Sequence, residues 1–295
     1  MDIDIAVLPV AGLGTRLLPL TKAVPKELLP LGRKPAIQRV VEELERSGTR
    51  TVLFVIGPKK TAIEDHFDLD LPLIDALRRG GKEEELGALD FERLPLRCFS
   101  TRQRTLNGLG HAVLAARDFV AERPFVVALG DAVIGIDSSG PLARMKEIFR
   151  AQAASAVVAF EEVESEAVSS YGIAHPKTDG PVFELEDIVE KPSPAEAPSR
   201  LAVAARYVFA PSIFAALAAT RPGKGGEIQL TDAIRAEIAA GRKVMGVRLA
   251  PDERRYDVGN FESYFEAFAA FALADASSGR ALRSKVEALL RAHHP

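Results

Sequence analysis

The sequence has very few of the residues on which several classes of protein depend. It contains one cysteine, Cys98, no tryptophan and four tyrosines among 295 residues. A single cysteine cannot form an intramolecular disulfide, which fits a protein of the reducing cytoplasm. Because Trp and Tyr are scarce, little is present from which to build a base-stacking surface for single-stranded nucleic acid.

Charge and hydropathy also argue against two kinds of partner. The formal net charge is −3, from 38 basic and 41 acidic side chains, so no global basic field exists to hold nucleic acid. No run approaches the roughly 18 apolar residues of a membrane helix. The first four residues, Met-Asp-Ile-Asp, are acidic where a signal peptide would be basic. We therefore expect a cytoplasmic protein with no nucleic-acid or membrane partner.

Short β-rich segments alternate with helical segments along the chain. Residues 51–56 lack polar alternation, which is typical of a strand buried on both faces. The alternation predicts a Rossmann-like α/β fold, with a mixed, mostly parallel central sheet flanked by helices. The other predicted strands are 3–9, 96–100, 125–129, 155–160, 183–190, 201–209 and 244–249, and the predicted helices are 36–46, 110–120, 213–219 and 230–240.

Nothing in the sequence divides the chain into independent domains. There is no Pro- or Ser-rich linker and no internal repeat, so we expect one domain over residues 1–295. Residues 66–95 are a polar, helix-prone excursion. From residue 260 the sequence is rich in Ala, Phe and Leu at helical spacing, and this tail could pack on the core or on another subunit.

A glycine-rich loop follows the first predicted strand. Gly12 and Gly14 let the backbone approach a phosphate closely, and Arg16 offers a bidentate guanidinium. No Walker A sequence occurs, and Leu17 stands where a dinucleotide fingerprint needs its third glycine. Two glycines alone would fit an ordinary turn. The loop, however, carries Arg16, Lys26 and Glu27 together with three prolines, at positions 19, 25 and 30, and a stiff loop with several charges favours a phosphate site.

The loop and its extension resemble the signature of bacterial UTP–glucose-1-phosphate uridylyltransferases, a branch of the sugar nucleotidyltransferases. The matching residues are Val10-Ala11-Gly12-Leu13-Gly14-Thr15-Arg16-x-Leu18-Pro19-x-Thr21-Lys22-Ala23-x-Pro25-Lys26-Glu27-x-Leu29-Pro30. The resemblance implies Mg²⁺-dependent transfer of UMP from UTP to α-D-glucose 1-phosphate, giving UDP-glucose and pyrophosphate. It implies a nucleotide-binding half at 1–150, a sugar-binding half at 151–259 and C-terminal helices at 260–295 that could assemble a homodimer or homotetramer.

The resemblance also assigns roles to residues that are far apart in the sequence. The catalytic set is Arg16, Lys26 and Lys191. The nucleotide-binding set is Ala11, Gly12, Gly14, Thr15, Glu27, Gln103 and Gly108, of which Gln103 and Gly108 would contact uracil and ribose. The sugar-binding set is Gly172, Glu190, Lys191 and Glu227, and the metal ligands are Asp131 and Asp257.

Several of these residues have an ordinary structural interpretation as well. Gly108 would suit a plain helix start, and Asp131 could cap the element after its strand. Glu190 and Lys191 could form a surface ion pair. Asp131 nevertheless follows a strand that we expect to be buried, where oxygen ligands suit a hard cation.

Three positions depart from the family pattern, and two other functions stay open. Asn107, Ala205 and Tyr256 stand where the family usually has Lys, Gly and His, and the methyl group of Ala205 either narrows the sugar pocket or has no effect. One alternative is an enzyme of the same fold that uses dTTP or another sugar 1-phosphate. The other is a non-catalytic regulator that binds a nucleotide sugar. The long first motif and Gln103 favour UTP, and the retained charged residues favour an enzyme.

Overall fold

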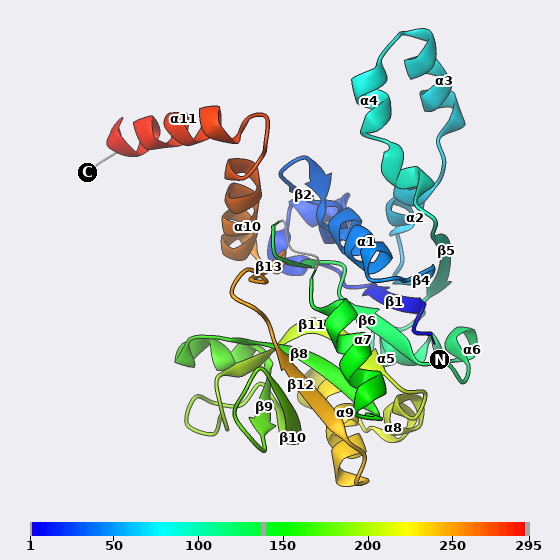
Figure 1. Cartoon of the computed structure of the whole chain (residues 1–295), viewed down its shortest axis with the longest axis vertical. Coiled ribbons are helices and arrows are strands. Elements are labelled where there is room, and N and C mark those ends of the chain that lie inside the picture. The colour runs from blue at the N-terminus through cyan, green and yellow to red at the C-terminus, as the bar shows by residue number, and fades with distance from the viewer. Residues whose placement is uncertain (1, 137–139, 293–295) are drawn as a thin grey trace.

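The computed structural model describes residues 2–136 and 140–292, and its centre is a nine-stranded sheet (Figure 1). Two strands, β10 and β11, run antiparallel to the other seven, which confirms the predicted mixed, mostly parallel sheet. The strands, in order across the sheet, are β5 (Arg97–Arg102), β4 (Thr51–Ile56), β1 (Ile5–Val10), β6 (Phe125–Ala128), β11 (Leu201–Phe209), β8 (Ala156–Glu162), β12 (Val244–Arg248), β10 (Val182–Glu190) and β9 (Gly172–Pro176).

Each face of the sheet is buried in its own hydrophobic core. In β1, Leu8 and Val10 point into one core while Ile5 and Val7 point into the other, as strand alternation requires. The helices that supply the first core are α1 (Ala36–Arg46), α7 (Leu142–Ala151) and α10 (Phe261–Leu273). Those that supply the second are α5 (Leu109–Leu114), α8 (Ile213–Ala219) and α9 (Leu230–Ala239).

The structure corrects the sequence analysis at several short elements. The helix expected at 110–120 is interrupted, because α5 ends at Leu114 and α6 (Arg117–Val120) begins after it. Strand β9 and helix α7 were not predicted. Nor were two small antiparallel ribbons, β2 (Pro30–Leu31) with β3 (Lys34–Pro35) and β7 (Ala132–Ile134) with β13 (Arg255–Asp257).

Two helical extensions leave the body of the molecule (Figure 1). The predicted excursion is helical and forms an arm of α2 (Thr61–Phe67), α3 (Leu71–Arg79) and α4 (Glu83–Gly87). At the other end, α11 (Gly279–Ala292) follows α10 and points away from the sheet. Residues 293–295 of the predicted tail lie outside the described residues. Within the described ranges, no helix has both the length and the apolar composition needed to cross a membrane.

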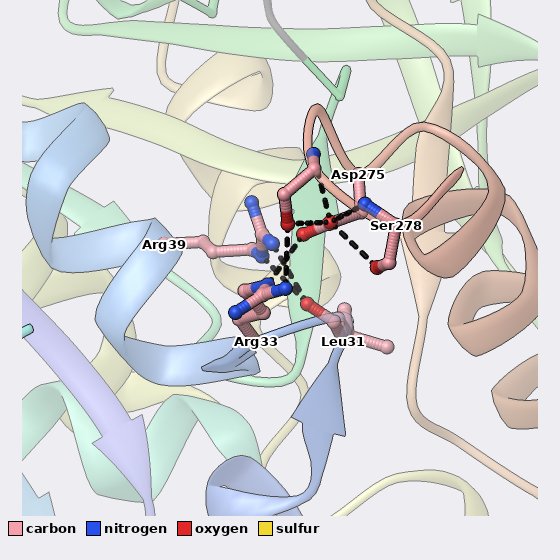
Figure 2. A network of polar contacts seen from close by, with 6 residues as sticks. Leu31, Arg33, Arg39, Asp275 and Ser278 are labelled. Carbon is pink, nitrogen blue, oxygen red and sulfur yellow. Dashed lines mark hydrogen bonds and ion pairs between the residues drawn. The ribbon is translucent and has the colours of Figure 1, made fainter. Parts of the chain in front are cut away.

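A polar network ties the start of α11 to the β2–β3 hairpin (Figure 2). Arg33 Nε lies 2.8 Å from Asp275 Oδ2, and Arg39 Nη2 donates to the Leu31 carbonyl at 2.7 Å. Hydrogen bonds from Ser278, and others from Ser277 and Arg33, hold the pKa of Asp275 below its usual range. The network therefore fixes the turn between α10 and α11 on the hairpin next to α1.

A buried ion pair joins the central strands to α1. Arg206 of β11 is fully buried, and its Nη2 lies 2.6 Å from Glu43 Oε2 on α1. The same guanidinium donates to the carbonyls of Ala205 at 3.0 Å and Ala132 at 2.9 Å, so both partners are extensively hydrogen-bonded. Breaking such a pair from one side leaves a charge buried without its partner.

We expect Arg206→Met to lower the free energy of unfolding by about 3–5 kcal/mol, because Glu43 would keep a buried charge. Arg206→Met/Glu43→Leu should recover part of this loss. The exposed pair Arg235–Asp187, with a separation of 2.7 Å, provides the control, and Arg235→Met should cost less than about 1 kcal/mol. Urea unfolding measures all three, and an equal cost for Arg206→Met and Arg235→Met would contradict the expectation.

Candidate active site

The glycine-rich loop that follows β1 is called the phosphate loop below. It is a series of tight turns at the carboxyl end of that strand. Gly14 has φ 66° and begins a short 3₁₀ turn, a left-handed conformation that favours glycine. Thr21 Oγ1 donates to the Gly14 carbonyl at 2.8 Å, and a methyl group on Gly14 would lie 3.0 Å from Thr21 Cγ2. The loop therefore folds back on itself with its glycine backbone facing a cavity.

That cavity has a volume of about 450 Å³ and gathers ten of the residues that the sequence analysis singled out. They come from the phosphate loop, from the segments after β5 and β6, and from the loop before α9. These residues are Ala11, Gly12, Gly14, Thr15, Lys26, Glu27, Gln103, Gly108, Asp131 and Glu227.

Lys26 and Asp131 form an ion pair within this cavity. Lys26 Nζ hydrogen-bonds Asp131 Oδ2, and both side chains are largely buried. Burial alone would favour the neutral amine, but the carboxylates of Asp131, Glu27 and Asp257 together outweigh it and raise the pKa of Lys26. Burial likewise opposes ionisation of Asp131, but Lys26, a backbone hydrogen bond and Lys60 together outweigh it and lower the pKa of Asp131. The pair is therefore held in its charged form.

Asp257 is brought to the same place by the unpredicted ribbon. Strand β13 pairs with β7, which puts Asp257 opposite Ala132, and Val258 N donates to the Asp131 carbonyl at 2.8 Å. Burial, and next the charge of Asp131, raise the pKa of Asp257 to about 6. The two carboxylates repel each other, and a divalent cation bound to their oxygens would relieve that repulsion.

Arg16 lies close to this carboxylate pair although it does not line the cavity. A methyl group on Gly259 would clash with Asp257 Oδ2 and lie 3.6 Å from Arg16 Nη2. The charge of Arg16 is also one of the influences that lower the pKa of Asp257. The predicted catalytic cation is therefore near Asp257.

The far end of the cavity is formed by close backbone contacts. Gly108 has φ 93°, and a methyl group there would lie 2.7 Å from Glu227 Cβ and 2.9 Å from the Ile228 carbonyl. Ile228 N donates to the Asn107 carbonyl at 2.8 Å. The buried Gln103 lies 3.1 Å from the Gly108 carbonyl and 3.0 Å from His111 Nδ1, so its amide orientation is fixed.

The other residues predicted to bind the sugar form a separate group and do not line this cavity. Gly172 of β9 pairs with Glu190 of β10, and Lys191 N donates to the Tyr171 carbonyl at 2.9 Å. Lys191 has φ 46°, and its Nζ lies 3.1 Å from Glu190 Oε1. The ion pair considered in the sequence analysis is thus present. Its place at the end of β10 is nevertheless compatible with a binding role.

Arg255 links this group to the carboxylate pair. It lies two residues before Asp257 in β13, and its guanidinium stacks over the Tyr171 ring at 4.5 Å. Its Nε donates to Glu161 Oε1 at 2.5 Å. A cavity of about 900 Å³ opens beside these residues, but of the predicted site residues it includes Asp257 alone. The larger cavity therefore includes one of the predicted site residues, whereas the 450 Å³ cavity includes ten of them.

One charged residue of the site was missed by the sequence analysis. Lys60 follows β4, and its Nζ lies 2.7 Å from Glu27 Oε2, with both residues buried. Burial raises the pKa of Glu27, while Lys60 acts against that shift. The sequence does contain a signal for Lys60. The turn Gly57-Pro58-Lys59-Lys60 follows a strand parallel to β1 and so leaves the same edge of the sheet.

The three departures from the family pattern have different structural settings. Ala205 is buried in the left-handed region with φ 59° and does not line the 450 Å³ cavity, so its methyl group affects the backbone rather than that cavity. Asn107 contributes its carbonyl to the contact with Ile228. Tyr256 packs edge-on against Phe271, with ring centroids 5.2 Å apart.

This arrangement defines a class of protein, an α/β protein built to bind a phosphorylated nucleotide at the carboxyl edge of its sheet. Comparison with known families is more specific. The chain belongs to the nucleotidyl transferase family, whose model matches residues 5–273.

Uridylyltransferases are among the proteins and solved structures that resemble the chain over most of its length. YngB of Bacillus subtilis (strain 168), a UTP–glucose-1-phosphate uridylyltransferase, is 43% identical over 263 residues, which cover 89% of this chain and 87% of YngB. A crystal structure of UDP-glucose pyrophosphorylase with UDP-glucose has a TM-score of 0.83 at 36% identity, covering 93% of this chain and all of that one. The UTP-bound enzyme of Acinetobacter baumannii has a TM-score of 0.87 at 33% identity, covering 97% and 99%.

We expect the left-handed conformation of Ala205 to be strained and to lower the free energy of unfolding. Its neighbour Ala204 is also buried in β11 but has no positive φ, so it provides a matched control. Replacing either residue by Gly removes one methyl group and adds the same unfolded-state freedom, but only Ala205→Gly relieves strain. The free energy of unfolding of Ala205→Gly should exceed that of Ala204→Gly by about 1–2 kcal/mol. Equal values in urea unfolding would contradict this.

Proposed function

We propose that the protein transfers UMP from UTP to α-D-glucose 1-phosphate, giving UDP-glucose and pyrophosphate. The observation that carries the proposal is the buried Lys26–Asp131 pair in the cavity formed by the phosphate loop. It is supported by relatives named UTP–glucose-1-phosphate uridylyltransferase and by similar structures described as bound to UTP or to UDP-glucose.

In the proposed reaction, an oxygen of the sugar phosphate attacks the α-phosphorus of UTP in line. The new P–O bond forms as the bond from the α-phosphorus to the β-phosphate oxygen breaks, and pyrophosphate leaves with that electron pair. The nucleophile is already an anion, so no general base is required. The work of the protein is then to position the two phosphates and to neutralise their charge.

Three cations share this work. Lys26 projects into the cavity and offsets charge at the α-phosphate. Arg16, beside Asp257, holds the leaving pyrophosphate. Lys191, at the end of β10, holds the phosphate of the incoming sugar, while Glu190 and Glu227 accept hydrogen bonds from its hydroxyl groups. Gln103 and Gly108 contact the uracil and ribose at the far end of the cavity.

We further propose that Asp131 and Asp257 hold Mg²⁺. Two carboxylates fit this ion, which prefers a few carboxylate ligands together with substrate phosphates. When bound, Mg²⁺ would stabilise negative charge on the triphosphate. Among the described residues, no cluster of three or more His, Cys, Asp or Glu side chains could hold a metal by itself, which agrees with a site completed by the substrate.

The proposal extends to assembly and location. Phe265 on α10 and Leu289 and Leu290 on α11 are more than half exposed, at 61%, 58% and 64%. An apolar surface of this kind suits contact with a second copy of the chain, as a homodimer or homotetramer. We place the protein in the cytoplasm, where both substrates would be available to it.

One assay tests the function against its alternatives. Pyrophosphate release is measured with each nucleoside triphosphate paired against glucose, galactose and N-acetylglucosamine 1-phosphates. We expect UTP with glucose 1-phosphate to give the highest kcat/KM. A preference for dTTP or another sugar would indicate a different enzyme of this fold. Binding of UDP-glucose without turnover of any pair would indicate a regulator.

Lys26→Met should lower kcat about 100- to 1,000-fold while the fold is retained, because a preorganised charge at the reacting phosphate is lost. The control is Lys34→Met, which removes a partly exposed lysine paired with Glu42 outside the cavity and should leave kcat unchanged. Initial rates and circular dichroism are measured for both. Near-normal turnover of Lys26→Met would refute the role of this lysine.

Asp131→Asn should raise the Mg²⁺ concentration required for half-maximal activity at least about tenfold, because one charged ligand is lost. Mg²⁺ titration at saturating UTP measures the change. Asp118→Asn alters an exposed aspartate on α6 and serves as the control. If the Mg²⁺ requirement of Asp131→Asn equals that of the control, Asp131 is not a ligand.

A further inference from the structure

A second buried ion pair, between Lys60 and Glu27, lies next to Lys26. Glu27 lines the 450 Å³ cavity next to Lys26, whereas Lys60, the residue before α2, reaches Glu27 without lining the cavity. Lys60 Nζ lies 2.7 Å from Glu27 Oε2, and the two side chains are 8% and 2% exposed. Lys60 therefore does not line the cavity, and it can act on a ligand there through its ion pair with Glu27 and through its charge, which also helps to lower the pKa of Asp131.

The order of the four charges determines which carboxylate pairs with Lys26. Lys60, Glu27, Lys26 and Asp131 form a series of alternating sign, in which Glu27 pairs with Lys60 and Asp131 pairs with Lys26. Glu27 also attracts Lys26 electrostatically, so the two carboxylates compete for one amine. As long as Lys60 occupies Glu27, this competition is settled in favour of Asp131.

Without Lys60, Glu27 would compete more strongly with Asp131 for the Lys26 amine. Glu27 would be a buried carboxylate with no direct partner in a low-dielectric setting, where an unpaired charge is strongly unfavourable. Lys26, the adjacent residue, is a cation that already attracts Glu27 electrostatically and could replace Lys60. Its amine would then be drawn toward Glu27 and away from Asp131 and the phosphate position.

We propose that Lys60 is a positioning residue: by holding the Glu27 carboxylate, it leaves the Lys26 amine to Asp131 and to the α-phosphate. This inference rests on the proposed function for its kinetic effect. Its structural effect, the choice of partner by Lys26, does not depend on which reaction the protein performs.

The first measurement compares Lys60→Met with Lys60→Arg, Glu27→Gln and the double variant Lys60→Met/Glu27→Gln. A misdirected amine should lower kcat of Lys60→Met about 100-fold, with a smaller change in the KM for UTP. Lys60→Arg keeps the cation and should stay within about tenfold of the parent protein. The exposed neighbour supplies the control, Lys59→Met, which should not change kcat.

The double variant separates positioning from mere structural support. If Lys60 acts by occupying Glu27, removing the Glu27 charge as well should raise kcat to near that of Glu27→Gln, because neighbouring residues in one network are not additive. A purely structural role predicts that the second substitution lowers kcat further. If Lys60→Met does not fold, the comparison of the double variant with Glu27→Gln decides the question alone.

A crystal structure of Lys60→Met, or of Lys60→Gln if Met is not tolerated, gives a readout independent of activity. We expect Lys26 Nζ to be bonded to Glu27 rather than to Asp131. Lys26 still on Asp131, or a double variant far below Glu27→Gln, would overturn the inference. Failure of the parent protein to turn over UTP and glucose 1-phosphate would refute the proposed function, and the crystal structure would still decide the role of Lys60.

Discussion

The buried pair between Arg206 and Glu43 is the interaction on which the site is built. Arg206 belongs to β11 and Glu43 to α1, so the pair fastens the antiparallel strand in the middle of the sheet to a helix on one face. The same guanidinium donates to the carbonyl of Ala132, the residue that follows Asp131. Because Ala132 pairs with Asp257 in the β7–β13 ribbon, one buried cation supports the backbone beneath both carboxylates.

Above this support, the site consists of charges that are each compensated by a neighbour. The Lys26–Asp131 pair is charged because each partner, together with other neighbouring groups, outweighs the burial of the other. Asp257 has a weaker compensation, since burial and Asp131 together raise its pKa to about 6. Asp257 is thus the carboxylate whose negative charge is least compensated. A site of this kind is ready for a cation that arrives with an anionic substrate, and less suited to a neutral ligand.

The sequence predicted the regular part of this fold well, and the reasons are local. Helices α1 and α8 and strands β4 and β11 have the predicted bounds, because long periodic or continuous apolar segments specify their own structure. Strands β7 and β13 have three residues each and form only because tertiary structure brings them together. The direction of β10 and β11 depends on the chain path between strands. A prediction from local pattern cannot supply either feature.

The same distinction explains which site residues could be found. Strands β4, β1 and β6 are parallel neighbours, so the segments that follow them must meet at one edge of the sheet. That rule alone brings together Gly12, Lys60 and Asp131. Lys60 carries no motif of its own, and only the position of its turn beside the phosphate loop indicates its role. Asp257 reaches the site through the ribbon, on a three-residue strand that local pattern does not specify. Its assignment therefore had to come from the resemblance to a family. Where a site is assembled from the ends of neighbouring parallel strands, topology is sufficient to find its residues. Where a short ribbon delivers one of them, the three-dimensional structure is needed.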